Sequence, residues 1–102
     1  MLHAISAREL RANFREYLES AEQGTQFVVL TRGRPIAILR PVRPDDEGVL
    51  VSVVSLRAEI PTAITRVPDR RLIVMRFNHA IAVLEAAPKE LIFVKRDEEE
   101  AS

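Results

Sequence analysis

The sequence contains no cysteine and no tryptophan, and it has only two histidines and three glycines. Without cysteine the chain has neither disulfide bonds nor thiolate ligands or nucleophiles. No apolar run approaches the ~20 residues of a membrane-spanning helix, so we expect no membrane partner. His3 and His79 have neither acid–base nor metal-ligand spacing. We therefore expect no enzyme, no catalytic residue, no metal and no cofactor.

The start of the chain also lacks the basic and then apolar segments of a secretory signal, which predicts a cytoplasmic protein. Charge is balanced overall, with 15 basic and 15 acidic residues, and this balance alone argues against a nucleic-acid partner. Residues 1–43, however, hold seven arginines against four glutamates, whereas residues 97–100 are all acidic. This asymmetry predicts different partners for the two ends, although a solvated surface explains the acidic end equally well.

A capping box predicts where the first helix begins, with Ser6 as the N-cap and Glu9 reaching back to it. Apolar residues follow at helical spacing as far as Ala21, and Gly24 is placed to end the helix. The pattern therefore predicts one amphipathic helix between Ser6 and Gly24.

A β-hairpin is predicted after this helix. Residues 27–32 are typical of a strand, Gly33 and Arg34 of a turn, and residues 35–42 of a returning strand. A polar linker, residues 43–48, separates the hairpin from the second half of the chain.

The second half predicts the same order of elements. Residues 49–54 indicate a strand, Ser55 an N-cap, and the helix after it is poor because Pro61 lies too deep for its first turn. A second hairpin is predicted over residues 72–84, and residues 90–95 indicate a last strand.

The two hairpins align without a gap at an offset of 45 residues. Gly33 falls opposite Asn78, and both residue types tolerate a positive φ in a turn. This alignment favours an α+β fold in which a helix-and-hairpin unit is duplicated into a pseudo-dimer. The expected divisions are residues 1–45, a degenerate second copy over 46–88, and a C-terminal strand and acidic tail over 89–102. Chance similarity between two half-buried hairpins is the alternative. Four aligned pairs are identical, namely Val29/Val74, Ile36/Ile81, Ala37/Ala82 and Leu39/Leu84.

Arginines of the first half form two predicted clusters. Arg8, Arg11 and Arg15 fall on one flank of the helix, while Arg32 and Arg34 flank Gly33 at the hairpin tip. Arginines near a helix start do not favour the helix itself, because that end carries positive potential. They suit a phosphate-bearing partner, and guanidinium groups bind phosphate and guanine in a bidentate manner. The alternative is an amphipathic helix whose charges are solvated.

Residues 2–42 resemble the N-terminal domain of the Phd/YefM antitoxins. The segments that carry the likeness are ISARELRANF (5–14) and FVVLTRGRPIAILRP (27–41). The resemblance implies a helix-and-hairpin fold, and a homo-oligomer that binds palindromic operator DNA and represses its own operon. It also implies a C-terminal segment that folds over a toxin and blocks it. In that family DNA is contacted from the start of the first helix and from an arginine at the strand end, which correspond here to Ser6, Arg8, Arg11 and Arg32.

The second copy departs from this pattern. When Ser6 is aligned on Ser55, the second copy keeps only Arg57, at the position of Arg8, and Ile60 falls at Arg11. At the hairpin offset of 45, Phe77 falls at Arg32. The interpretation is that the second copy packs against the first and does not contact DNA.

The short C-terminal segment is the expected toxin-binding element. It offers apolar anchors and acidic groups that imitate phosphates, although an edge strand of the chain's own sheet is the alternative. Three functions stay open: an antitoxin that represses its operon, a stand-alone regulator without a toxin, and a dimerisation module that does not bind DNA. The candidate partner-binding residues are Leu91, Phe93, Val94, Asp97 and Glu98.

Overall fold

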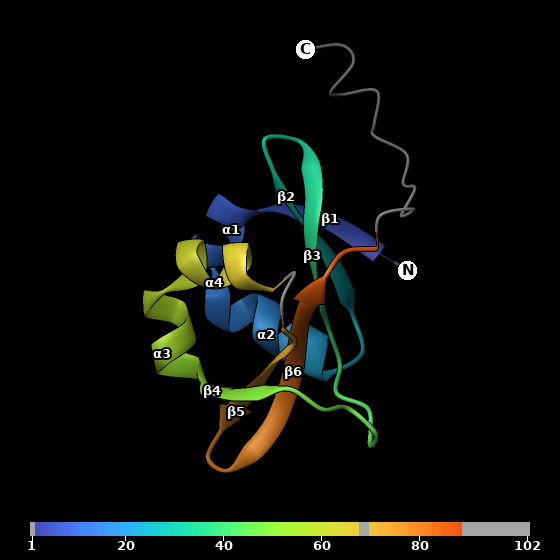
Figure 1. Ribbon diagram of the computed structural model, residues 1–102, viewed down its shortest axis with the longest axis vertical. Helices are drawn as coiled ribbons and strands as arrows, with labels where there is room; N and C mark the ends of the chain where they lie inside the picture. Colours follow the sequence, from blue (N-terminus) through green and yellow to red (C-terminus); the bar gives the residue numbers. More distant parts are fainter. Residues whose placement is uncertain (1, 68–69, 89–102) are drawn as a thin grey trace.

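A six-stranded sheet with four short helices forms the fold in a computed structural model of the chain (Figure 1). The structure describes residues 2–67 and 70–88, and for residues 65 and 66 the backbone alone. The sequence-based expectation of a mixed α+β fold is confirmed. Within the described residues, no helix has the length and apolar character needed to cross a membrane.

Two halves of the chain have the same order of elements. The first unit (residues 2–40) contains β1 (Leu2–Ser6), α1 (Ala7–Ala12), α2 (Phe14–Glu22), β2 (Gln26–Thr31) and β3 (Arg34–Arg40). The second unit (residues 49–86) contains β4 (Val49–Ser52), α3 (Val53–Ala58), α4 (Ile60–Arg66), β5 (Leu72–Arg76) and β6 (His79–Ala86). In each unit the first strand pairs in parallel with the second, and the second and third strands form an antiparallel hairpin.

The two units join edge to edge into one sheet with the order β1-β2-β3-β6-β5-β4. At the join, β3 and β6 run antiparallel and Leu39 pairs with Leu84, its own equivalent at the offset of 45. On either side of it, Ile38 pairs with Glu85 and Arg40 pairs with Val83. At the offset of 45, Ile38 is equivalent to Val83 and Arg40 to Glu85, so the two pairs are equivalent to each other. The arrangement therefore has an approximate twofold axis at the Leu39–Leu84 pair.

The first helical segment is broken, which corrects the expectation of one continuous helix. Asn13 leaves the helical region, with φ −126° and ψ 43°, so α1 ends at Ala12 and α2 begins at Phe14. Asparagine is an ordinary residue for such a break, because its side chain competes with helical backbone bonding. Both Leu10 and Phe14, on either side of the break, are buried.

The second helical segment begins earlier than the sequence suggested. Ser52 is the N-cap, because its Oγ accepts a hydrogen bond from the Ser55 N–H at 3.0 Å, and β4 is correspondingly shorter than the expected strand. Glu59 breaks this segment as Asn13 breaks the first, so Pro61 lies in the first turn of α4, where proline is tolerated. The expectation that Ser55 caps a helix weakened by Pro61 was therefore wrong.

Each hairpin turns through two residues that both have positive φ, the type I′ geometry. In the first turn these are Arg32 (φ 54°) and Gly33 (φ 77°), one position earlier than expected, and in the second Phe77 (φ 52°) and Asn78 (φ 67°). The two tips lie at opposite ends of the molecule (Figure 1).

All four helices contribute to one apolar core against the sheet, so neither unit has a core of its own. About 40 residues alone bury too little apolar surface for an ordinary stable domain. The largest buried aliphatic side chains come from both units and include Leu10, Leu18, Leu39, Ile60 and Leu84.

A network of ion pairs holds the segment between the two units in place. This segment, residues 43–48, was expected to be a polar linker without such contacts. The Arg40 side chain is 3% exposed and its Nη2 lies 2.7 Å from Asp46 Oδ1. Its Nε donates to Glu85 Oε2 at 2.8 Å, and the more exposed Arg71 donates from Nε to Glu85 Oε1 at 3.1 Å. The hydrogen bond from Arg40 lowers the pKa of Asp46 to about 2. Arg40 is thus a structural residue of the join and not part of an exposed basic surface.

The expected last strand, residues 90–95, lies outside the described residues. The same holds for the five candidate partner-binding residues, Leu91, Phe93, Val94, Asp97 and Glu98.

Candidate nucleic-acid interface

The start of α1 is fixed by the capping box that the sequence predicted. The Ser6 N–H donates to Glu9 Oε1 at 2.8 Å, and the Glu9 N–H donates to Ser6 Oγ at 2.9 Å. Ser6 is thus first a helix cap, and only its hydroxyl proton is left to donate to a ligand.

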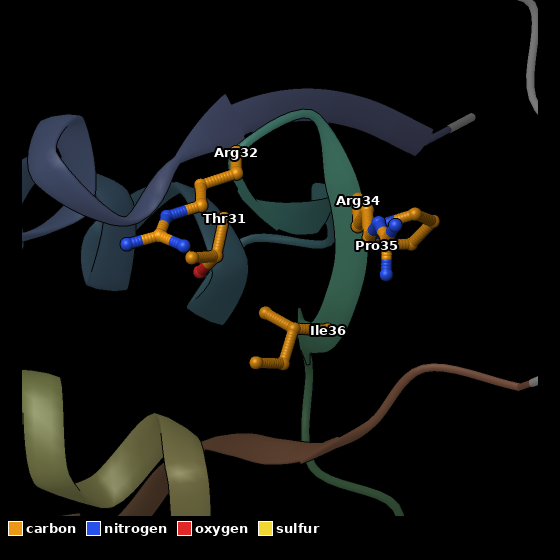
Figure 2. Close-up of a pocket in the computed structure, with 5 residues that line it drawn as sticks. All are labelled: Thr31, Arg32, Arg34, Pro35 and Ile36. Atoms are coloured by element: carbon orange, nitrogen blue, oxygen red, sulfur yellow. The ribbon is translucent and has the colours of Figure 1, made fainter.

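The parallel pairing of β1 and β2 places the start of α1 beside the end of the first hairpin. Ser6 pairs with Leu30, so Arg32 follows two residues beyond the level at which α1 begins. Figure 2 shows the Arg32 side chain extending to the side of the hairpin on which α1 lies. The structure therefore brings Arg32 next to the beginning of α1, as the candidate site requires.

The side chain of Arg34 does not extend toward the start of α1. It pairs with Thr31 across the hairpin, and Figure 2 shows its side chain on the other side of the hairpin from Arg32. A hollow of about 560 Å³ lies at the hairpin and is lined by Thr31, Arg32, Arg34, Pro35 and Ile36. Arg34 thus lines the hollow at the hairpin tip together with Arg32, but only the Arg32 side chain extends toward α1.

Two of the three remaining predicted arginines line a cleft between the helices of the two units. Arg11 and Arg15 lie on the α1–α2 side, and Arg57 of α3 completes the basic lining. The cleft has a volume of about 580 Å³, and the rest of its lining is apolar, formed by Phe14, Val53, Val54 and Ala58. Arg8 is exposed one turn before Arg11, so it lies on the same face of α1.

Arg57 was misplaced by the sequence alignment. Counted from the N-caps that the structure defines, Ser6 and Ser52, the helices of the two units are offset by 46 residues. Arg57 is therefore the equivalent of Arg11, and Val54 is the equivalent of Arg8. The signal that would have found this is the pair of buried leucines, Leu10 and Leu56, at the same offset.

Five exposed arginines form no ion pair with any side chain that the structure describes, namely Arg8, Arg11, Arg15, Arg32 and Arg57. A smaller hollow of about 360 Å³ continues from the cleft, and Glu16 is the one acidic residue in its lining, beside Arg15 and Arg57. The arrangement is thus a row of free guanidinium groups suited to an anion with several charges. The row consists of Arg32, Arg8, Arg11, Arg15 and Arg57.

The second unit presents a different surface at the equivalent positions. Val54 replaces Arg8 and is 79% exposed, Phe77 replaces Arg32 and is 86% exposed, and His79 replaces Arg34. The basic surface therefore belongs mainly to the first unit. Arg57 continues it at the cleft, and Arg76, which is paired with Glu22, lines a separate hollow with Arg15.

Comparison with known proteins yields no relative: no family model, no curated protein and no solved structure matches the chain. Among the residues that the structure describes, no three His, Asp or Glu side chains form a group that would hold a metal ion.

Proposed function

We propose that the chain is an antitoxin of the Phd/YefM type that binds operator DNA and represses its own operon. The observation that carries the DNA-binding part is the row of exposed arginines, from the first hairpin tip along α1 and into the cleft, with no acidic partner among the described residues. Contacts to the phosphate backbone supply most of the affinity of such proteins for DNA.

The position of these arginines supports a partner better than a folding role. Arg8 lies in the first turn of α1, where the helix dipole disfavours a cation. Arg32 occupies a turn position with φ 54°, which a non-glycine residue adopts at a cost. An anionic surface that meets both side chains gives a reason for this placement, whereas a solvated surface gives none.

The proposal includes a duplicated unit, so that one chain contains the equivalent of a dimer. The matching element order, the equivalent Leu39–Leu84 pair at the join and the constant offset within the hairpins support this interpretation. In it, the second unit takes the place of a second protomer and has exchanged most of its basic side chains for apolar ones. The resemblance of residues 2–42 to Phd/YefM antitoxins agrees with the role of the first unit.

The toxin-neutralising part of the proposal comes from the resemblance alone. A regulator of the same fold without a toxin is the alternative, and it predicts that no small toxin gene lies beside the gene for this chain. A dimerisation module that does not bind DNA predicts no affinity for the DNA upstream of that gene.

The test is DNA binding by two single variants, Arg11→Ala and Arg32→Ala. Each is expected to weaken binding to duplex DNA from upstream of the chain's own gene, by about 1–3 kcal/mol if the side chain reads bases. A side chain that contacts phosphate alone lowers the affinity for every sequence and flattens the salt dependence.

Arg70→Ala is the matched control, because Arg70 is exposed and lies outside the row of arginines. Wild-type affinity in a gel-shift assay for both Arg11→Ala and Arg32→Ala, with unchanged circular dichroism, would refute the site.

A further inference from the structure

The second unit has lost the counterparts of Arg8 and Arg32 but has kept the counterpart of Arg11. Because Arg11 and Arg57 are equivalent, the approximate twofold arrangement directs both toward the space between α1 and α3. There they line one cleft together with Arg15. The cleft is thus a place where the basic surface of the first unit continues onto the second through an arginine that has no described ion pair, unlike Arg76, which is paired with Glu22 beside a separate hollow.

Three exposed guanidinium groups around one cleft repel one another, and the described part of the chain supplies no ion pair to any of them. Glu16, at the edge of the neighbouring hollow, is the single acidic side chain in either lining. A ligand that brings at least one negative charge between the arginines relieves this repulsion. The volume of about 580 Å³ is large enough for a nucleotide-sized group, and Phe14 and Val53 supply apolar surface between the arginines.

We propose that Arg57 closes a phosphate clamp with Arg11 and Arg15, so that the DNA backbone is held between the two units. This inference rests on the proposed DNA-binding function and adds a contact from the second unit, where Arg57 forms no ion pair with any described side chain while Arg76 is paired with Glu22. Each guanidinium presents several N–H donors in a fixed plane, which matches the two free oxygens of a phosphodiester. Base reading stays with the first unit, at Arg32 and the start of α1.

The clamp makes a distinct prediction about salt and sequence. The plot of log affinity against log salt concentration has a negative slope, and loss of one phosphate contact makes this slope less steep by about 0.9. The loss weakens binding to all DNA sequences alike. Arg57→Ala should therefore weaken binding to upstream DNA and to unrelated DNA by the same factor. Arg57→Lys keeps the charge, so it should restore the salt slope without restoring the full affinity, because lysine lacks the planar fork.

The experiment measures binding of fluorescent duplexes, upstream and unrelated in sequence, at several salt concentrations. The proteins are the full-length wild type, Arg57→Ala, Arg57→Lys, Arg11→Ala and the control Arg70→Ala, each with its fold verified by circular dichroism. The clamp is supported if Arg57→Ala lowers the slope by about one contact with the sequence preference unchanged, while Arg70→Ala behaves as wild type.

The outcomes separate the clamp from the function on which it rests. If Arg11→Ala lowers the slope and Arg57→Ala does not, the clamp is wrong and DNA binding stands. If the wild-type chain does not bind either duplex, the proposed function fails and the clamp fails with it. A third measurement is titration of the wild-type chain with inorganic phosphate. If phosphate saturates the cleft while neither duplex binds, the DNA clamp is overturned.

Discussion

Replacing Asp46 with asparagine should destabilise the folded chain at neutral pH and should have progressively less effect as the pH falls. The Asp46 side chain is 5% exposed and lies between two arginines, with its Oδ1 2.7 Å from Arg40 Nη2 and 3.8 Å from Arg71 Nη1. Asparagine has nearly the same shape, so the change removes the charge and leaves the packing of the loop in place.

The magnitude follows from the pKa of Asp46, which is about 2 in the folded chain against 3.8 for an ordinary aspartate. A depressed pKa contributes stability that is present above the unfolded value and is lost as the pH falls through the folded value. The difference corresponds to about 2 kcal/mol at neutral pH. Solvent near the loop screens part of this, and Glu85 still bonds Arg40, so we expect a loss of roughly 1–2 kcal/mol.

The assay is urea unfolding of the wild type and Asp46→Asn between pH 7 and pH 2, followed by far-UV circular dichroism because the chain has no tryptophan. The free energies of unfolding should differ most at pH 7 and converge between pH 4 and pH 2, where Asp46 itself becomes protonated. Asp45→Asn is the control, since that neighbouring side chain is exposed. A difference that stays constant over this range would mean that the charge of Asp46 contributes nothing, and the reasoning would be refuted.

Two further changes test the local backbone. Phe77→Asn should raise the free energy of unfolding by about 1 kcal/mol, because Phe77 has φ 52° and is 86% exposed, so that asparagine loses no packing and relieves strain. The melting temperature should rise by roughly 4–8 °C, whereas Phe77→Ala should give little or no increase, because alanine lacks the short polar side chain that favours a positive φ in asparagine. Ser6→Ala should cost about 1 kcal/mol, since the Glu9 N–H loses its acceptor, and Ser6→Thr should recover most of it in urea unfolding. Equal stability of Ser6→Ala and wild type would show that the cap is dispensable.

Local signals in the sequence predicted the first unit well. The capping box at Ser6 and Glu9 and the alternation of the hairpin strands each act over a few residues, and the structure confirms them. The second helical start was missed because Ser52 and Ser55 are three residues apart and either one fits the N-cap pattern. Only the parallel register of β4 with β5, which ends at Ser52 and Met75, distinguishes the two serines.

Long-range effects could not be predicted in the same way. The count of arginines in residues 1–43 included Arg40 without distinguishing it from the exposed ones. In the structure its partners Asp46 and Glu85 are brought to it by the loop and by the pairing of β3 with β6. The position of Arg57 opposite Arg11 has the same origin, because it depends on how the two units are joined. Sequence spacing within one element contains no information about such a join.

The join between the units also determines how DNA occupancy should depend on the amount of protein. Arg40 and Glu85 are equivalent positions of the two units, and they form an ion pair across the approximate twofold axis. Two first units placed in the same arrangement would bring two buried arginines together without this carboxylate, which is strongly unfavourable. The first unit is therefore matched to the second unit of its own chain, to which it is permanently tethered. If the chain binds DNA as proposed, its occupancy at a single site should rise with the first power of protein concentration and not with the square.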